Sequence, residues 1–400
     1  IKSLLLGSAA AMVAASGAQA ADAIIFAEPE PTEYVRICDT YGTGFYYIPG
    51  TETCLRVGGY LRYDIGGGDV FAVESVDKRD FARFLAGEIG LADVGVNDTY
   101  YQRARAALQL DARSETEFGT LRGYIHANFD YTTAQVGAGV AFDVLGFPIL
   151  AVTGPASTSD WNTWIEHAFI ELGGFRVGMT DSMFSTFTGY TSGVSNDGLA
   201  VPYGPFATHQ ISYTFSGGNG FSAAIALESG RGGDYAFGVR GGPAGIIGYT
   251  EWLDDLYAID SYMPHVVAGV GFEQAWGGIR AVVGYDSVWE EWAAKLRADF
   301  NFGAGSVFLM AGWKSNDVGP NYYGAGWGGD WALWGGASFD VTETASINLE
   351  LGYDDAETFH AVANVAWSPV ENFTITPEVV YIDTPAGDGW GGFVRFQRNF

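Results

Sequence analysis

Histidine, serine and acidic side chains carry most enzyme chemistry, and here they form no recognisable catalytic arrangement. No HExxH, G-x-S-x-G or phosphate-binding glycine motif occurs. Glu166 and His167 are neighbours, but we expect no joint site because successive residues of a strand point to opposite faces. The sequence therefore predicts no catalytic residue, no metal site and no cofactor. The histidines are His126, His167, His209, His265 and His360.

The basic residues are spaced more regularly, and several lie two positions apart, as Arg103 and Arg105 do. Guanidinium and ammonium groups on one face of a sheet attract anions and orient dipolar solutes. They can equally pair with acids on the same face and hold the sheet together. For each basic residue the sequence leaves both roles open. The candidates are Arg56, Arg62, Arg103, Arg105, Arg113, Arg122, Lys295 and Arg297.

Composition excludes nucleic-acid binding and favours a β protein. The chain has 47 acidic against 20 basic residues, whereas neutralising phosphates needs clusters of Lys and Arg. Glycine supplies 57 of 400 residues and aromatic residues 15%, which is typical of β proteins with many turns. Hydrophobic residues make up 48%, enough to argue against disorder. We predict an all-β chain.

The first twenty residues have the three parts of a secretory signal peptide. Lys2 precedes an apolar run at residues 4–15, and Ala18-Gln19-Ala20 is a small-residue cleavage sequence. We predict that residues 1–20 are a signal peptide and that the protein is exported. A buried N-terminal helix is the alternative.

Cys38 and Cys54 are the two cysteines of the chain. In an oxidising compartment they are expected to form a disulfide, which stabilises by roughly 3 kcal/mol for a loop of this size. Two cysteines without a second Cys or His pair nearby make a poor zinc site. We expect residues 21–54 to form an N-terminal segment closed by this bond. Two unpaired cysteines are the alternative.

Polar and apolar residues alternate along most of the remaining chain. In residues 101–113, arginines and other polar side chains occupy one parity, and Ala and Leu occupy the other. Period-two alternation over ten or more residues indicates strands with one polar and one apolar face. Sixteen strands are predicted, at 55–65, 101–113, 121–131, 161–172, 174–184, 208–215, 220–228, 265–276, 279–287, 292–302, 305–314, 330–340, 345–354, 358–367, 372–382 and 390–400.

The predicted connections alternate between long and short in the first half of the chain. Tight turns at one end and long loops at the other are typical of an outer-membrane β-barrel. Strands of about ten residues are long enough to cross the hydrocarbon layer, with the apolar face toward lipid. A secreted β-sandwich, with its apolar face inward, is the alternative. The long connections are 66–100, 132–160, 185–207 and 229–264.

The last predicted strand ends in a phenylalanine, Phe400. A terminal Phe on an alternating aromatic strand resembles the signal by which outer-membrane barrels are recognised for assembly. Arg395, Gln397 and Asn399 share its polar face. Because a barrel in lipid cannot leave an open edge, we expect residues 390–400 to pair with residues 55–65.

Three segments resemble the alphaproteobacterial porin family. EYVRICD at 33–39 and TCLRVGGYLRYD at 53–64 look like the start of that family, and GGFRVGMTDS at 173–182 is similar to its fifth strand. The resemblance implies a sixteen-stranded, homotrimeric, water-filled diffusion channel for small hydrophilic solutes and ions. It places residues 21–54 in the periplasm and residues 55–400 in the outer membrane, among lipid and lipopolysaccharide.

The resemblance also implies a constriction, because the loop after the fifth strand bends into the lumen of porins. Here that loop is residues 185–207, and Asp197 is its one acid. We expect Asp197 to face basic side chains across the pore. The basic side chains implied are Arg56, Arg62, Arg103, Arg105, Lys295 and Arg297, while Arg113 and Arg122 flank a turn and are weaker candidates.

Ion selectivity is expected to be weak despite the formal net charge of −27. Exposed loop acids are screened within about 8–10 Å at physiological salt, whereas lumen charges act at contact distance. A substrate-selective channel is the alternative function. Its expected feature is an aromatic track, which Tyr60, Tyr124, Tyr190 and Trp334 could supply.

Overall fold

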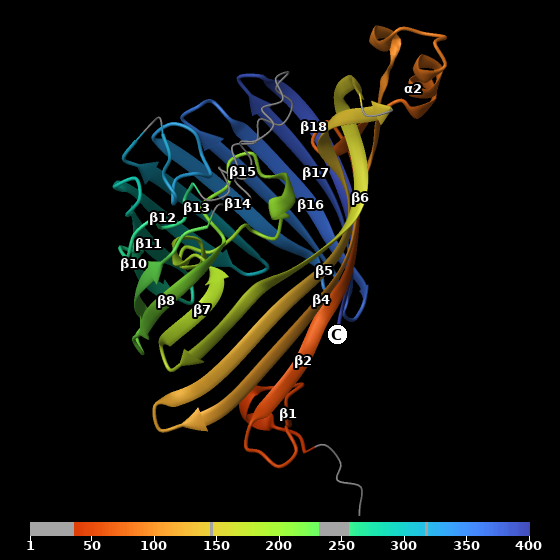
Figure 1. The fold of residues 1–400 in the computed structure, drawn as a ribbon. Coiled ribbons are helices and arrows are strands. Elements are labelled where there is room, and N and C mark those ends of the chain that lie inside the picture. The colour runs from red at the N-terminus through yellow and green to blue at the C-terminus, as the bar shows by residue number, and fades with distance from the viewer. Residues whose placement is uncertain (1–35, 145–146, 232–255, 317–318) are drawn as a thin grey trace, which may run out of the picture.

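The computed structural model describes residues 36–144, 147–231, 256–316 and 319–400 (Figure 1). The predicted signal peptide, residues 1–20, lies outside the described residues. So do the first part of the predicted segment 21–54 and most of the predicted loop 229–264. Within the described ranges, no helix is long and apolar enough to cross a membrane.

Among the described residues, sixteen antiparallel strands pair into one closed ring. β18 pairs with β2, and β2 pairs with β4, so the ring has no free edge. The sixteen-stranded barrel and its closure by the C-terminal strand are thus confirmed. The strands are β2 (Cys54–Gly68), β4 (Val96–Thr116), β5 (Gly119–Val144), β6 (Phe147–Leu172), β7 (Phe175–Asp181), β8 (Ala207–Ser216), β9 (Phe221–Glu228), β10 (His265–Gln274), β11 (Gly277–Asp286), β12 (Glu291–Phe302), β13 (Gly305–Lys314), β14 (Trp331–Thr342), β15 (Ala345–Asp354), β16 (Phe359–Val370), β17 (Phe373–Thr384) and β18 (Gly387–Asn399).

The two faces of the barrel follow the alternation in the sequence. On β13, Leu309 and Trp313 point outward and are 60% and 50% exposed, as expected for side chains that meet lipid. Phe308 and Met310 point inward and are buried. The apolar residues inside the barrel pack against a chain segment that enters the lumen, which is described below.

Beyond the ring, the predicted loop 66–100 contains structure of its own. β3 (Ala72–Val76) pairs with the start of β4, and it is followed by α2 (Lys78–Leu85) and a 3-10 helix (Leu91–Asp93). Asp77 caps α2, because its Oδ1 accepts hydrogen bonds from the backbone N–H groups of Arg79 and Asp80 at 2.8 and 3.1 Å.

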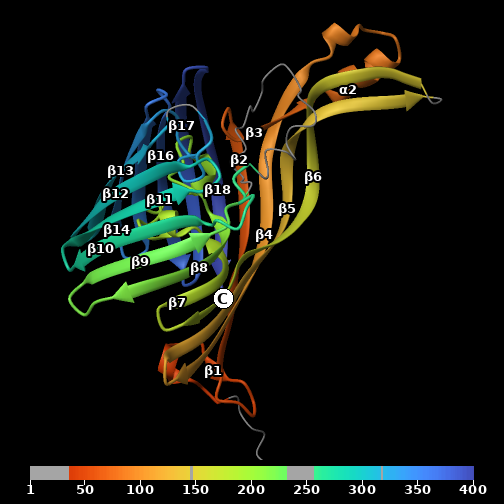
Figure 2. The ribbon, with the colours of Figure 1, turned by 60° about the vertical axis from the view of Figure 1, so that its left-hand side comes forward.

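The prediction of a long loop at 132–160 is wrong. β5 and β6 continue to pair up to Val144 and Phe147. The hairpin that they form rises beyond the rest of the barrel, beside the segment that carries α2 (Figures 1 and 2). In this stretch small and apolar residues occupy both parities, so the polar–apolar alternation that marks the other strands is hidden.

β7 is shorter than the predicted strand 174–184, and this shortening begins the constriction. Ser182 ends the strand by capping a short helix, α3 (Met183–Thr186). As a result, β6 pairs with β7 only from Ala168 to Leu172. From there the chain leaves the barrel wall and enters the lumen.

At the other end of the barrel, the predicted disulfide between Cys38 and Cys54 is present, with Cα atoms 6.0 Å apart. Both cysteines pack with Phe45 in a small buried cluster. The short strand β1 (Tyr46–Tyr47) pairs with the start of β2. The disulfide therefore ties the N-terminal segment to the first strand of the barrel.

Candidate functional site

The chain between β7 and β8, residues 182–206, crosses the inside of the barrel, and we call it the constriction segment. It is tied to strands on the far wall. Ser195 N–H donates to Glu378 Oε2 at 2.9 Å, Asn364 Nδ2 donates to Gly193 O at 3.0 Å, and Trp334 Nε1 donates to Val201 O at 2.7 Å. The predicted inward-folded loop is thus confirmed, and its course is fixed by hydrogen bonds to β14, β16 and β17.

The entry of the constriction segment is held by one buried acid. Glu228, at the end of β9, accepts hydrogen bonds from Ser182 Oγ and from Met183 N–H, both at 2.7 Å. Ser182 Oγ also accepts from Phe184 N–H at 3.1 Å, which caps α3. The polarity of Ser182 therefore both stops the strand and directs the chain inward.

An apolar cluster holds the rest of the segment against the wall. Phe184, Val201 and Tyr203 are at most 1% exposed and pack with Trp334 on β14 and with Tyr323 in the connection between β13 and β14. Burial of these side chains removes apolar surface from water that would otherwise fill the lumen. The segment is therefore a packed part of the structure.

Asp197 lies at the tip of the segment and forms an ion-pair network with the barrel wall. Arg103 Nη2 lies 2.8 Å from Asp197 Oδ2, and Arg395 Nη2 lies 2.7 Å from the same oxygen. Both arginines also bind the buried Asp64, with closest distances of 2.7 and 2.8 Å. We expected Asp197 to face the arginines across the pore. Instead it is in direct contact with one of them, Arg103, and with Arg395, which was not among the predicted residues.

Two further arginines, Arg62 and Arg105, lie beside Arg103 and Arg395, and we call these four residues the basic wall. Arg105 pairs with Asp130 through two hydrogen bonds of 2.8 Å and lies 4.7 Å from the centre of the Trp164 ring. Arg62 Nε donates to Gln397 Oε1 at 2.9 Å. The basic wall therefore contains four guanidinium groups, and three carboxylates are in contact with it: those of Asp64, Asp130 and Asp197.

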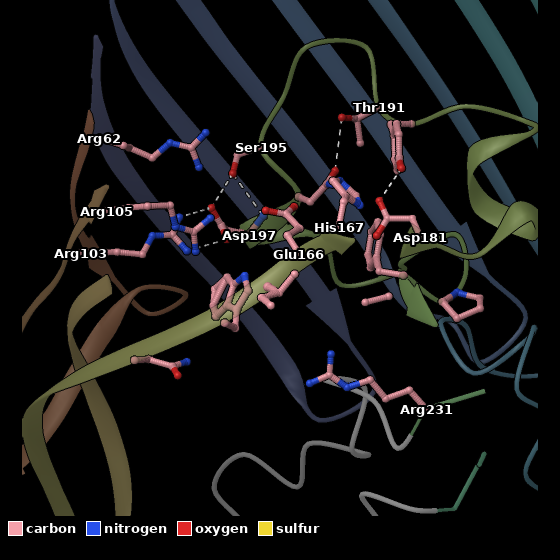
Figure 3. A pocket seen from close by; sticks show the side chains of 18 of the residues that line it. Arg62, Arg103, Arg105, Glu166, His167, Asp181, Thr191, Ser195, Asp197 and Arg231 are labelled. Carbon is pink, nitrogen blue, oxygen red and sulfur yellow. Dashed lines mark hydrogen bonds and ion pairs between the residues drawn. The ribbon is translucent and has the colours of Figure 1, made fainter. Parts of the chain in front are cut away.

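An opening of about 890 Å³ lies between this basic wall and the constriction segment. Figure 3 shows Arg62, Arg103 and Arg105 on one side of it and Asp181 on the other. Asp181 accepts a hydrogen bond of 2.5 Å from the Tyr190 hydroxyl. Glu166 also lines the opening. Asp181 thus lies across the opening from the three arginines, and Arg231 lines the opening as well.

Three of the residues predicted for the constriction, Arg56, Lys295 and Arg297, do not line this opening. Lys295 is buried, and its Nζ donates to Tyr203 O at 2.6 Å. Arg297 pairs with Asp299 and donates to Tyr190 O at 2.5 Å. Both support the constriction segment from β12.

Arg56 lies away from the opening, in a group at the turn end of the barrel. It lies 3.6 Å from Asp111, which also pairs with Arg113 and Arg122. Three basic residues share one buried carboxylate there, and none of them lines the opening between the basic wall and the constriction segment.

Arg395 is a site residue that the sequence reasoning missed. Its position on the polar face of the last strand was the available signal, but nothing in the sequence connects that strand with the constriction segment. Arg231, which also lines the opening, lies in a predicted loop without a regular pattern.

Comparison with known proteins decides the family. A family model described as the porin subfamily matches residues 22–389. The chain belongs to the porin subfamily. This porin is 47% identical to the porin Omp2a of Brucella melitensis over an alignment of 409 positions that covers 100% of both chains.

Solved structures agree on the fold. The outer membrane channel DcaP of Acinetobacter baumannii aligns with a TM-score of 0.57 at 16% identity, covering 88% of this chain and 99% of that chain. OmpT, an outer membrane protein of Vibrio cholerae solved in a trimer form, aligns with a TM-score of 0.50 at 10% identity, covering 88% and 100%. The porin is accordingly an outer-membrane β-barrel, as predicted.

Proposed function

We propose that this porin is a general diffusion channel whose narrowest part is the opening between the basic wall and the constriction segment. The observation that carries the proposal is the path of residues 182–206, which cross the lumen and are bonded to its far wall. The solute path then passes Arg62, Arg103, Arg105 and Arg395 on one side and Asp181 on the other, and Glu166 and Arg231 also line it. Small hydrophilic solutes and ions that fit this opening diffuse through it.

Weak ion selectivity follows from the balance of charge at this opening. Four guanidinium groups are nearly neutralised by Asp64, Asp130 and Asp197. Two further acids, Glu166 and Asp181, and one further arginine, Arg231, also line the opening. A transverse field of this kind orients dipolar solutes without strongly excluding either ion. The many acids of the exposed loops are screened by salt and contribute little at the constriction.

The substrate-selective alternative loses support from the aromatic residues. Trp334 is only 2% exposed and lies beneath the constriction segment, where it bonds to Val201 O. Tyr190 is bound to Asp181. Tyr60 and Tyr190 line the opening, but Trp334 is buried away from it, so the four predicted aromatic side chains do not form a continuous track along a solute path.

We further propose that the porin is a homotrimer in the outer membrane, in contact with lipid and lipopolysaccharide. The trimer form of OmpT supports this. The barrel wall supports it too, because only five residue pairs join β6 to β7. A neighbouring subunit packed on this weak part of the wall would shield the β6 backbone from lipid.

The test is single-channel recording in planar bilayers with the unheated, detergent-purified porin. We expect ohmic current, insertion steps in groups of three, and a small reversal potential in a potassium chloride gradient. Heat-unfolded protein is the control. A folded protein without conductance, or a permeability ratio that strongly favours one ion, would contradict the proposal, and single insertion steps would contradict the trimer.

A further inference from the structure

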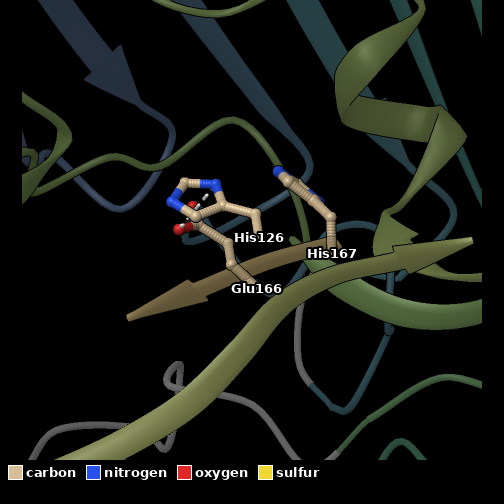
Figure 4. Close-up of side chains that lie close together, drawn as sticks. All are labelled: His126, Glu166 and His167. Carbon is tan, nitrogen blue, oxygen red and sulfur yellow. Dashed lines mark ion pairs between the residues drawn. The ribbon is translucent and has the colours of Figure 1, made fainter. Parts of the chain in front are cut away.

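Three potential metal ligands meet on the lumen wall, on two neighbouring strands. They are His126 on β5 and Glu166 and His167 on β6 (Figure 4). One ligand atom from each residue can be chosen so that all three lie within 4.8 Å of one another. Glu166 and His167 also line the opening, so water and ions can reach the cluster.

A β-bulge brings these residues together, and this is why the sequence reasoning missed them. His126 pairs with His167, but the next residue of β5, Ala127, pairs with Ile165. Glu166 is therefore the extra residue of the bulge. At such a bulge two consecutive side chains can point to the same face. The expectation that the side chains of Glu166 and His167 point to opposite faces is wrong for this reason.

Neighbouring polar groups form hydrogen bonds with the carboxylate and with one imidazole. Asn128 Nδ2 donates to Glu166 Oε2 at 2.5 Å, and Thr180 Oγ1 lies 3.0 Å from His167 Nδ1. Outer-shell hydrogen bonds of this kind orient metal ligands and leave the other ring nitrogen free to bind.

His126 is the member of the cluster whose hydrogen bonding is incomplete. It is 7% exposed, and its Nδ1 lies 3.6 Å from Glu166 Oε2. Its Nε2 is buried and has no hydrogen-bond partner among the described residues. A buried polar atom without a partner costs free energy. A bound ion would offset that cost.

We propose that His126, Glu166 and His167 form a binding site for a divalent transition-metal ion of the Zn²⁺ class. Two imidazoles and one carboxylate suit Zn²⁺, Cu²⁺ and Ni²⁺ better than Mg²⁺ or Ca²⁺, which prefer oxygen ligands only. With Zn²⁺, water completes the four-coordinate shell from the lumen side.

The ligand atoms must move closer together for binding. Tetrahedral ligands about 2.0–2.1 Å from Zn²⁺ lie roughly 3.3 Å apart, which is less than the 4.8 Å limit of the cluster. Glu166 is 36% exposed and borders the lumen, so its side chain has room to move. The site goes beyond the proposed diffusion function and does not depend on it.

The test is isothermal titration calorimetry of the detergent-purified porin with zinc chloride in a non-coordinating buffer. We expect one ion per chain. The variants His126→Gln, Glu166→Gln and His167→Gln should each weaken binding at least about tenfold, as the loss of a ligand does. His209→Gln is the matched control, because His209 is an exposed histidine on β8.

Copper EPR of the same proteins gives a second readout that does not involve channel activity. We expect coupling to two imidazole nitrogens in wild type and to one in either histidine variant. Glu166→Gln preserves side-chain shape, so it tests the site even where a histidine variant fails to fold. The proposal is overturned if wild type shows no saturable binding at millimolar Zn²⁺, or if Glu166→Gln binds as tightly as wild type.

Discussion

Arg395 Nη2 lies 2.7 Å from Asp197 Oδ2, although the two residues are 198 positions apart in the chain. Arg395 belongs to the closing strand β18, and Asp197 belongs to the constriction segment. Arg395 Nε also donates to Asp64 Oδ1 on β2 at 2.8 Å. One guanidinium thus joins the two strands that close the barrel to the element that narrows it. The constriction and the closure of the barrel are therefore structurally coupled.

The substitution Asp197→Asn should make the channel more anion-selective. It removes one of the three carboxylates that neutralise the basic wall. Two unit charges 4 Å apart interact by about 1 kcal/mol in water, so we expect a change of up to about fivefold in the permeability ratio. Reversal potentials in a potassium chloride gradient measure it.

Asp98→Asn is the control for that experiment. It makes the same charge change at an exposed residue near the start of β4, where salt screens the charge. The reversal potential of this variant should match that of wild type. Equal reversal potentials for Asp197→Asn and wild type would contradict the assignment of Asp197 to the constriction.

The charge of Asp197 should survive at low pH. Burial raises the pKa of Asp197, but Arg103 and Arg395 act more strongly in the other direction and hold that pKa well below its usual range. A carboxyl whose pKa is lowered by folding contributes stability at neutral pH, and loses it only as pH falls through the folded-state pKa.

We therefore expect the selectivity difference between wild type and Asp197→Asn to persist at about pH 4, where an ordinary aspartate is half protonated. Reversal potentials of both proteins at neutral and at low pH measure this. Loss of the difference over that interval would show that Asp197 titrates normally, and hence that its contacts with the two arginines are weak.

How far the sequence predicts this site depends on which interaction is considered. Alternation places Arg103 and Arg105 on the polar face of a strand, because that face is fixed by a period of two. The contact of Asp197 with Arg395 cannot be obtained this way, since it depends on the path of 25 residues through the lumen. Glu166 shows a second reason why the prediction fails. It is the extra residue of a β-bulge, so the rule that successive side chains point to opposite faces does not hold there.

Gly193→Ala should loosen the constriction segment. Gly193 has φ +93°, and a Cβ there would lie 2.6 Å from Asn348 Oδ1. Asn348 cannot easily move away, because it is bonded to Ser338 and Asn364. We expect a larger and noisier single-channel conductance, and a loss of about 1–3 kcal/mol in the free energy of unfolding.

The matched control for this glycine is Gly218→Ala in the turn between β8 and β9. A Cβ at Gly218 meets no atom within 4 Å. Conductance and stability of that variant should equal those of wild type. If Gly193→Ala also behaves as wild type, the segment does not hold the position that the hydrogen bonds to β14, β16 and β17 indicate.

Removing the disulfide should change stability but not conduction. The double substitution Cys38→Ser/Cys54→Ser opens a loop whose closure stabilises by roughly 3 kcal/mol. We expect a lower midpoint of thermal unfolding, measured by circular dichroism, with single-channel conductance unchanged because the bond lies at the start of β2. Altered conductance in a folded double variant would mean that the N-terminal segment also shapes the pore.

The central claim is that Arg62 faces the solute path at the constriction, while Leu61, the residue before it, faces lipid. Among the described residues no cysteine is free, so an introduced thiol can be labelled specifically. A negatively charged, membrane-impermeant methanethiosulfonate reagent should reduce the current of Arg62→Cys and leave that of Leu61→Cys unchanged, since Leu61 is 56% exposed on the outer face. An unchanged current in Arg62→Cys, or an equal reduction in both variants, would contradict the account.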